Sequence, residues 1–138
     1  MTNPWLYRDI EFTSEMIEDN VGFVYTITNL TNDRKYIGKK LFWTPKTKMV
    51  NKKKKKFKVE SEWKDYHGSN KELASDVELL GADKFKRVIM TLCKSKGSCS
   101  YYEAKMQFEC NAMLSEEYYN TWIMVRVHKK HMLTSINK

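Results

Sequence analysis

The chain has 138 residues, of which 41% are hydrophobic and 13% aromatic, and this suits a single domain (residues 1–138) with one hydrophobic core. The formal net charge of +8 favours a polyanionic partner, either a nucleic acid or a membrane surface. No apolar run is long enough for a transmembrane helix, no basic amphipathic helix is evident and the N-terminus lacks a secretion signal. We therefore expect a nucleic-acid partner and no membrane contact.

The cysteines indicate a reducing compartment. Cys93, Cys99 and Cys110 are odd in number, and no closely spaced pair among them could anchor a zinc site together with His67 or His128. They are predicted to be reduced thiols of a cytoplasmic protein.

Residues 21–43 are predicted to form a β-hairpin, preceded by an arm (residues 1–20) that packs on its sheet. Val, Ile, Thr, Phe and Tyr fill the two runs on either side of a polar turn at 31–34. The second strand is expected to end at Thr44–Pro45, because proline cannot donate a hydrogen bond to a neighbouring strand.

The hairpin brings two tyrosines to one face. Because its loop has an even number of residues, odd-numbered positions oppose even-numbered ones, and directly opposed residues share a face. Tyr25 and Tyr36 then point to the same side, with Gly38 and Lys40 beside them. Glycine lets another backbone or a ligand come close, so this face is either a catalytic surface or the ordinary packing of a half-buried sheet.

The most basic part of the chain, residues 46–58, is predicted to be a solvent-exposed loop, since adjacent lysines repel one another and cannot pack in a core. Such a loop can become ordered on a polyanion, so we predict that it contacts the phosphates of a nucleic acid. A nuclear-localisation signal is the alternative interpretation of the lysine run. The lysines of the segment are Lys46, Lys48, Lys52, Lys53, Lys54, Lys55, Lys56 and Lys58.

Helices and one more strand follow this segment. A short helical turn is predicted at 60–66, and a helix at 71–80 has Ser69 or Asn70 as its N-cap. The apolar run at 85–92 is typical of a third strand.

The last third of the chain predicts a second main helix at 100–114, because Ser100 and Glu103 have the spacing of a capping box. A turn and a last strand are expected at 118–127, and the tail at 128–138 is expected to be frayed.

This order of elements indicates an α+β fold, with a small antiparallel or mixed β-sheet of three or four strands flanked by helices. The core of the domain is expected to span about residues 22–127.

Two short motifs resemble a known family. Gly22-Phe23-Val24-Tyr25 is followed, eleven positions after its tyrosine, by Tyr36-Ile37-Gly38, and this pair is similar to the signature of the GIY-YIG nucleases. The first motif has one extra residue between glycine and tyrosine, a variation that the family tolerates. The resemblance extends over about residues 22–123 and implies the same order of strands and helices.

The resemblance implies a metal-dependent DNA endonuclease that hydrolyses phosphodiester bonds with Mg²⁺ or Mn²⁺. In this family one glutamate on the helix after the third strand holds the metal, and Glu103 stands in that place, although the pattern alone favours the capping box. Tyr25 is expected to accept the proton of the attacking water, and Tyr36 to hydrogen-bond water or phosphate. Neighbouring lysines or the metal must then lower the phenol pKa.

The sequence departs from the family where an arginine is expected, because the matching position is Glu62. A carboxylate cannot stabilise the negative charge that grows on phosphate. Lys40 is the best substitute by its face of the strand, with Lys39 beside it if a bulge at Gly38 rotates the strand.

Two further residues resemble family positions. His67 could act as acid, base or phosphate ligand, or it could be a helix-end histidine stabilised by the helix dipole. Asn120 resembles the asparagine that braces the family's active site, and it also fits a turn before a strand.

The motifs look most like small, free-standing phage members described as homing-type endonucleases, which would act in the cytoplasm of the host cell. No separate DNA-binding region is visible, so site specificity is expected from the basic loop, from a homodimer or from a partner. The alternative is a catalytically weak or inactive nucleic-acid-binding accessory protein on the same fold, favoured by Glu62 in the arginine position.

Overall fold

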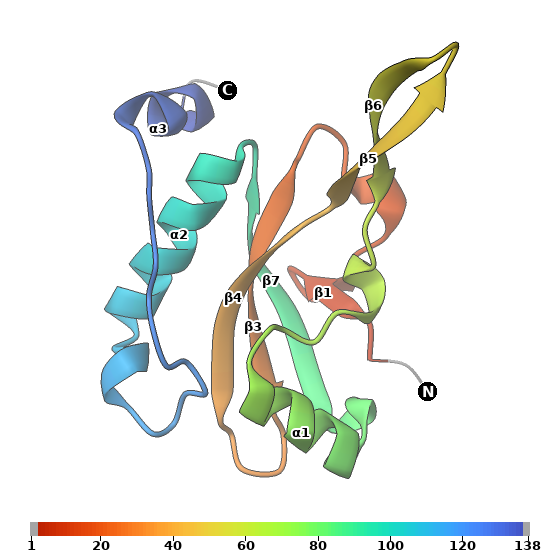
Figure 1. The fold of residues 1–138 in the computed structure, drawn as a ribbon. Helices are drawn as coiled ribbons and strands as arrows, with labels where there is room; N and C mark the ends of the chain where they lie inside the picture. Colours follow the sequence, from red (N-terminus) through yellow and green to blue (C-terminus); the bar gives the residue numbers. More distant parts are fainter. Residues whose placement is uncertain (1–2, 137–138) are drawn as a thin grey trace.

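The computed structural model describes residues 3–136, without the side chains of 134–136, and Figure 1 shows its elements in chain order. The extreme ends of the predicted arm and tail, residues 1–2 and 137–138, lie outside the described residues. The fold is α+β, as predicted, with one mixed sheet, helices beside it and a separate two-stranded sheet. None of the described helices is long and apolar enough to cross a membrane.

The predicted hairpin and third strand form three neighbouring strands of the main sheet. Strand β3 (Gly22–Asn29) pairs antiparallel with β4 (Lys35–Leu41) on one side and with β7 (Phe85–Cys93) on the other. The arm adds two short strands beyond β7, which are β1 (Trp5–Tyr7), parallel to β7, and β2 (Ile10–Glu11). The strand order is β2-β1-β7-β3-β4, so β4 is an edge strand.

An aromatic cluster fills one face of this sheet. The Trp5 ring lies 5.0 Å from the rings of both Phe23 and Tyr25, and Phe42 and Trp63 pack against them. Each such ring pair adds about 0.5–1.5 kcal/mol beyond the apolar area that it buries. The arm is fastened to the cluster by the Trp5 indole, which donates to the carbonyl of Trp63 at 2.6 Å.

The main helix α2 (Lys96–Glu109) covers the opposite face of the sheet (Figure 1). Val24 and Ile37 point to that side and pack with Cys99 of the helix and Ala112 beyond it. The two faces of the β3–β4 hairpin are therefore both buried, one by aromatic rings and the other by small side chains.

The predicted helix at 71–80 is confirmed as α1 (Lys71–Leu80). Asn70 is its N-cap, because its side-chain oxygen accepts a hydrogen bond from the Leu73 backbone amide at 2.9 Å. Leu73 and, in part, Val77 turn to the aromatic cluster.

The predicted start of α2 near Ser100 was wrong, because the helix begins four residues earlier, at Lys96. Its capping box consists of Ser95 and Ser98, which exchange hydrogen bonds at 3.0 and 3.2 Å. Glu103 is thus not a capping residue, and it lies in the middle of the helix.

The lysine-rich segment is a β-hairpin and not the expected loop. Strands β5 (Trp43–Val50) and β6 (Lys53–Glu60) pair antiparallel and make a sheet of their own. The main-sheet strand ends at Leu41, and Pro45 lies within β5. Proline is tolerated there because both strands of a two-stranded ribbon are edge strands.

The C-terminal part differs most from the prediction. Residues 119–128 form no strand, and Tyr118 makes a single parallel bridge to Lys35 before the chain runs irregularly along α2 (Figure 1). The tail predicted to be frayed forms α3 (Lys129–Ile136), next to the first turn of α2. Four short 3₁₀ turns occur in the described chain: η1 (Ser14–Met16), η2 (Trp63–Asp65), η3 (Ala82–Lys84) and η4 (Ala112–Leu114).

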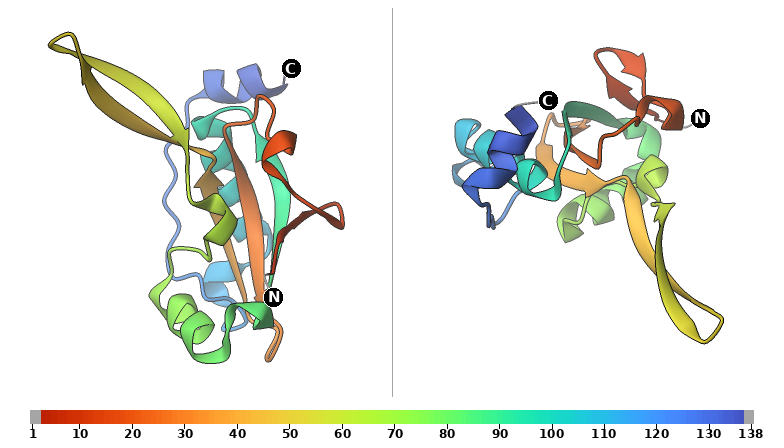
Figure 2. Two further views of the ribbon diagram at one scale, coloured as in Figure 1. Left: turned by 90° about the vertical axis from the view of Figure 1, so that its right-hand side faces the viewer. Right: turned by 90° about the horizontal axis from the view of Figure 1, so that it is seen from above.

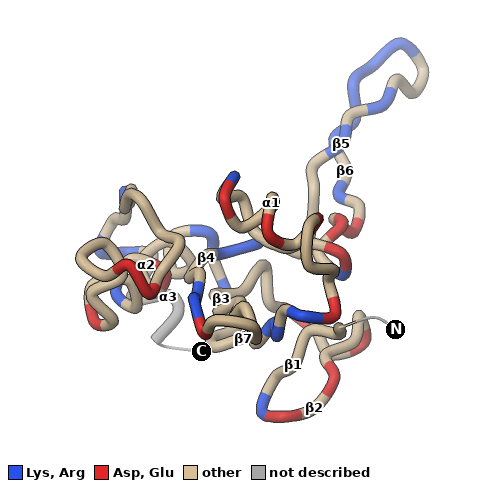
Figure 3. Tube along the Cα trace, turned by 90° about the horizontal axis from the view of Figure 1, so that it is seen from below, with Lys and Arg blue, Asp and Glu red and all other residues tan. Residues whose placement is uncertain are grey.

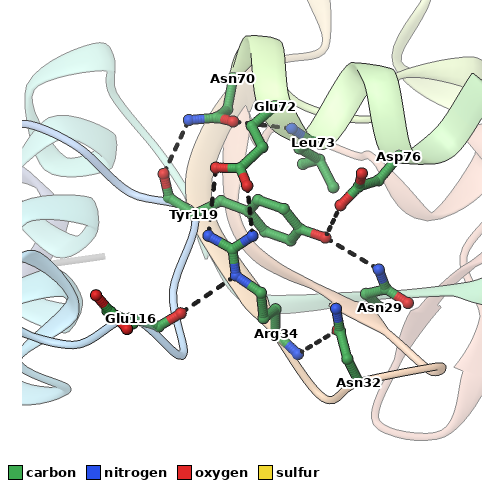
Figure 4. A network of polar contacts seen from close by, with 9 residues as sticks. All are labelled: Asn29, Asn32, Arg34, Asn70, Glu72, Leu73, Asp76, Glu116 and Tyr119. Carbon is green, nitrogen blue, oxygen red and sulfur yellow. Dashed lines mark hydrogen bonds and ion pairs between the residues drawn. The ribbon is translucent and has the colours of Figure 1, made fainter.

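Arg34, at the turn of the β3–β4 hairpin, joins three segments (Figure 4). Its guanidinium donates to both carboxylate oxygens of Glu72 on α1, at 2.6 and 3.3 Å, and to the carbonyl of Glu116 at 3.2 Å. It also lies 4.1 Å from the centre of the Tyr119 ring, a favourable cation–π distance.

Tyr119 continues this network into the core (Figure 4). Its hydroxyl donates to the Asp76 carboxylate at 2.7 Å and accepts from the amide of Asn29 at 3.0 Å, while the Asn70 amide donates to its backbone carbonyl at 2.9 Å. The segment before Asn120 is thereby held against the sheet by α1.

Removing the Tyr119 hydroxyl tests this network. We expect Tyr119→Phe to lower the free energy of unfolding by about 1–3 kcal/mol, because the buried Asn29 amide loses its acceptor. Denaturant titration measures the loss. The matched control is Tyr101→Phe, an exposed tyrosine on α2 without a hydrogen bond to any described residue, and an equal effect of both substitutions contradicts the assignment.

Candidate active site

A pocket of about 420 Å³ lies at the open edge of β4. Because β4 is an edge strand, side chains from both faces of the sheet reach it: Tyr36 from the aromatic face and Lys39 from the face covered by α2. Glu103 comes from α2 and Asn120 from the segment after Tyr119. The pocket therefore unites four of the seven residues predicted to be catalytic. Its remaining lining residues are Ser69, Asn70, Gln107, Thr121, Trp122 and Met124.

Glu103 carries the negative charge of this pocket. Its carboxylate is half-buried and accepts no hydrogen bond from any residue of the described chain. Burial raises the pKa of the Glu103 carboxyl, and the charge of nearby Lys39 opposes that shift. The Lys39 ammonium itself donates to the Ser100 hydroxyl at 2.6 Å.

Tyr25 and Tyr36 share a face of the hairpin, as their register predicts, and their ring centres are 6.2 Å apart. They are not equivalent. Tyr25 is only 1% exposed and lies in the aromatic cluster, whereas Tyr36 is half-buried on the pocket wall with its hydroxyl 3.1 Å from that of Ser69. Tyr36 is therefore the phenol within reach of a substrate.

Gly38 makes room for the buried phenol. A Cβ atom at this position would lie 2.4 Å from the Tyr25 hydroxyl and 2.8 Å from the Tyr36 ring. The close approach that this glycine permits is thus made by the two tyrosines.

Burial raises the pKa of Tyr36 and, more strongly, that of Tyr25. The negative charge of Glu103 acts in the same direction on both phenols. Both phenols are therefore protonated at neutral pH.

Asn120 closes part of the strand edge. Its side-chain oxygen accepts from the Ile37 amide at 3.0 Å, and its side-chain nitrogen donates to the Ile37 carbonyl at 2.8 Å. Gln107 of α2 donates to the same carbonyl at 3.1 Å. The Asn120 amide thus takes the place of a neighbouring strand, and this is why no backbone strand forms after Tyr118.

Lys40 lies outside this pocket. It forms an ion pair with Glu62 and lies 4.3 Å from the centre of the Tyr66 ring, on the aromatic face of β4. Lys39 is consequently the only one of the two adjacent lysines that lines the pocket.

His67 also lies apart from the pocket. It lines a separate pocket of about 500 Å³ beside Arg87 and hydrogen-bonds the Asp65 carbonyl at 2.9 Å. Burial and the positive charge of Arg87 lower the His67 pKa.

Sequence reasoning did not propose several residues of this pocket. Gln107 follows Glu103 by one helical turn, so the spacing of two polar residues on one helix face is a signal for it. Ser69 and Asn70 are predicted as candidate helix caps. No signal marks Trp122 and Met124, because their segment has no regular structure.

The GIY-YIG domain of the putative endonuclease segE is the family whose sequence model matches this chain, over residues 5–123. The match covers most of the sequence, and the chain belongs to the GIY-YIG nuclease superfamily. Membership supports a nuclease function in general terms. Searches of curated proteins and of solved structures found no match.

The pocket fits a divalent cation held by one carboxylate. The described residues contain no group of three or more His, Cys, Asp or Glu side chains that could enclose a metal. Mg²⁺ is commonly held by one or two carboxylates together with water and substrate phosphate. A half-buried carboxylate without a hydrogen-bond donor, in a pocket that Tyr36 and Ser69 also line, matches that chemistry.

The raised pKa of Glu103 has a consequence for stability. Because the folded state holds this proton more tightly than the unfolded chain, the associated stability is present below the unfolded pKa and is lost as pH rises through the folded pKa. We expect Glu103→Gln, which removes the charge and keeps the shape, to be more stable than the wild type near pH ~7, with a smaller difference near pH ~4.

Denaturant titration at both pH values measures this effect in metal-free buffer. The control is Glu109→Gln, an exposed glutamate at the end of the same helix. A Glu103→Gln protein that is less stable than the wild type near neutral pH contradicts the assignment.

Proposed function

We propose that this chain is a DNA endonuclease of the GIY-YIG type, which hydrolyses phosphodiester bonds with Mg²⁺ or Mn²⁺ at the edge of β4. The observation that carries the proposal is the unpaired Glu103 carboxylate, which faces the same pocket as the Tyr36 phenol and the Lys39 ammonium. A carboxylate that could hold a metal, a cation and a hydrogen-bond donor in one pocket are groups that can stabilise the charge that grows on phosphate.

Each of these residues has a role that follows from its position. Glu103 would hold the divalent cation, which would supply positive charge for the phosphate and activate water when bound. Tyr36 donates a hydrogen bond to a phosphate oxygen or to the attacking water, because its phenol is protonated at neutral pH. Lys39 provides the positive charge that the family obtains from arginine. Its ammonium group acts as a point charge and cannot make the paired hydrogen bonds of a guanidinium group.

Tyr25 and Asn120 act by positioning in this proposal. Tyr25 supports the Tyr36 ring from the aromatic cluster and does not line the pocket. Asn120 fixes the β4 edge at Ile37, one strand position before Gly38. We give His67 no role in the chemistry, because it lines the other pocket.

DNA is the proposed substrate because the lysine-rich hairpin adds a strongly cationic surface. Figure 3 shows Lys and Arg concentrated along β5 and β6, where Glu60 at the base of β6 is the single acidic residue. Every lysine of this hairpin is exposed. Phosphate contacts of this kind supply most of the affinity of non-specific DNA binding.

The similarity to small phage-type members supports a homing-type role in the cytoplasm of a host cell, as part of the same proposal. A homodimer would place two pockets on one duplex and would give a route to double-strand cleavage.

One observation favours a second candidate, a nucleic-acid-binding protein without cleavage activity. Glu62 stands at the arginine position and pairs with Lys40, so neither residue brings a cation to the pocket. Lys39 is then the single lysine available for the growing phosphate charge among the residues that line the pocket.

Plasmid nicking distinguishes the two candidates. With Mg²⁺ or Mn²⁺, we expect the wild type to nick supercoiled DNA, Glu103→Gln to be inactive, and Tyr36→Phe to be slower by about 10²–10³-fold. Lys39→Met is expected to lower the rate similarly, whereas the neighbouring Lys40→Met serves as the matched control with a much smaller effect.

Equal rates for the wild type and Glu103→Gln contradict the proposed site. An absence of cleavage by any of the proteins, together with salt-sensitive DNA binding, supports the binding-only candidate.

A further inference from the structure

The β5–β6 hairpin has a geometry that its charge alone does not explain. We infer that it is a ribbon that inserts into the major groove of duplex DNA, with phosphates on both of its sides. This inference rests on the DNA-binding part of the proposed function and adds the form of nucleic acid and the mode of contact.

The hairpin stands away from the rest of the domain (Figure 2). Its strands pair only with each other, and a hydrogen bond of 2.7 Å from Ser61 N to Phe42 O joins its two ends at the base. Eight residues per strand give a length of about 26 Å. A two-stranded ribbon of this kind fits the major groove of B-DNA, which is about 12 Å wide and about 8.5 Å deep.

The tip of the ribbon is narrow. Asn51 and Lys52 both have left-handed backbone angles, with φ of 51° and 63°. This is the conformation of a tight two-residue turn that matches the twist of the flanking strands. The ribbon therefore tapers to a single turn and has no bulky loop that would prevent entry into a groove.

Lysines occupy both faces of the ribbon. Side chains alternate between faces along a strand, and the register pairs Lys48 with Lys55 and Met49 with Lys54. One face carries Lys46, Lys48, Lys53 and Lys55, and the other carries Lys54, Lys56 and Lys58.

The presence of lysines on both faces distinguishes between two modes of binding, in which the ribbon either lies flat on the nucleic acid or inserts into a groove. A ribbon that lies flat on a nucleic acid needs cations on one face only, and lysines on its outer face would then have no phosphate partner. In a groove, each face meets one of the two phosphate backbones, so charge on both faces is used.

The charge is also uncompensated within the hairpin itself. Directly opposed like charges, as in the pair of Lys48 and Lys55, destabilise a sheet. No acidic residue occurs at positions 44–59, and Glu60 at the base accepts hydrogen bonds from Ser14 and Trp63. An external polyanion is therefore the partner that relieves the repulsion.

Two exposed apolar side chains lie among the lysines, one on each face of the ribbon. Met49 near the tip is 62% exposed and Phe57 is 41% exposed, between lysines on either strand. The major groove presents the thymine methyl group, which such side chains can contact.

Matched variants test whether both faces are used. One protein carries Lys48→Gln, Lys53→Gln and Lys55→Gln, and the other carries Lys54→Gln, Lys56→Gln and Lys58→Gln. Binding to a duplex of about 30 base pairs, roughly three helical turns, is measured against salt concentration with a metal chelator present, so that no cleavage occurs. We expect the slope of log affinity against log salt to fall by about three for each variant.

A second measurement identifies the groove. We expect bulky sugar groups on the cytosine C5 positions, which fill the major groove, to weaken wild-type binding by about tenfold or more. Netropsin, which fills the minor groove, is expected to have a much smaller effect. Replacement of residues 44–59 by a short Gly-Ser turn should remove the sensitivity to the sugar groups.

A slope change in only one triple variant, or unchanged binding to the sugar-modified duplex, overturns the inference. Cleavage that persists in that case leaves the nuclease proposal intact. Conversely, groove-dependent binding through both faces with no cleavage under any metal condition supports the inference and removes the nuclease proposal.

Discussion

The exposed edge of β4 is the constraint on which this structure depends. Backbone groups at a sheet edge need partners, and an uncovered edge invites unwanted pairing. Here the segment around Tyr118 pairs with Lys35, and the Asn120 side chain replaces a strand at Ile37. No further segment of the described chain pairs with the β4 edge beyond Ile37. The pocket that Glu103 lines opens over the remaining part of the strand. The strand edge with backbone groups unpaired in the described chain is therefore also the place where a substrate can approach the sheet.

The pocket contains a half-buried charge that lowers the stability of the fold, and packing elsewhere in the domain compensates for this loss. A half-buried carboxylate without a hydrogen-bond donor is unfavourable for a folded chain, because desolvation penalises its charge. The cluster around Trp5 and the network around Arg34 hold the strands and the pocket wall in place despite this cost. Active sites commonly reduce stability in this way. The domain thus separates two tasks, with a rigid sheet around the pocket and a protruding ribbon that carries the charge.

The parts that sequence reasoning predicted are those that local rules determine. The β3–β4 hairpin follows from β-prone runs around a polar turn, and α1 follows from Asn70 as a cap. The lysine ribbon was missed because its strands lack the alternation of apolar and polar residues that marks a strand in a sequence. The two strands are recognised only from their pairing in the structure. The strand expected after Tyr118 was wrong because a side-chain amide took its place. The ion pair of Lys40 with Glu62 joins positions 22 residues apart, and nothing in the local pattern indicates it.

The central claim is that Glu103 holds a divalent cation at the edge of β4, and paramagnetic broadening by Mn²⁺ tests it directly. The amide signals of Tyr36, Ser69 and Asn120 should broaden in the NMR spectrum of the wild type as Mn²⁺ is added, and the broadening should disappear in Glu103→Gln. Broadening centred on another part of the chain, or broadening of these signals that persists in Glu103→Gln, would contradict the account.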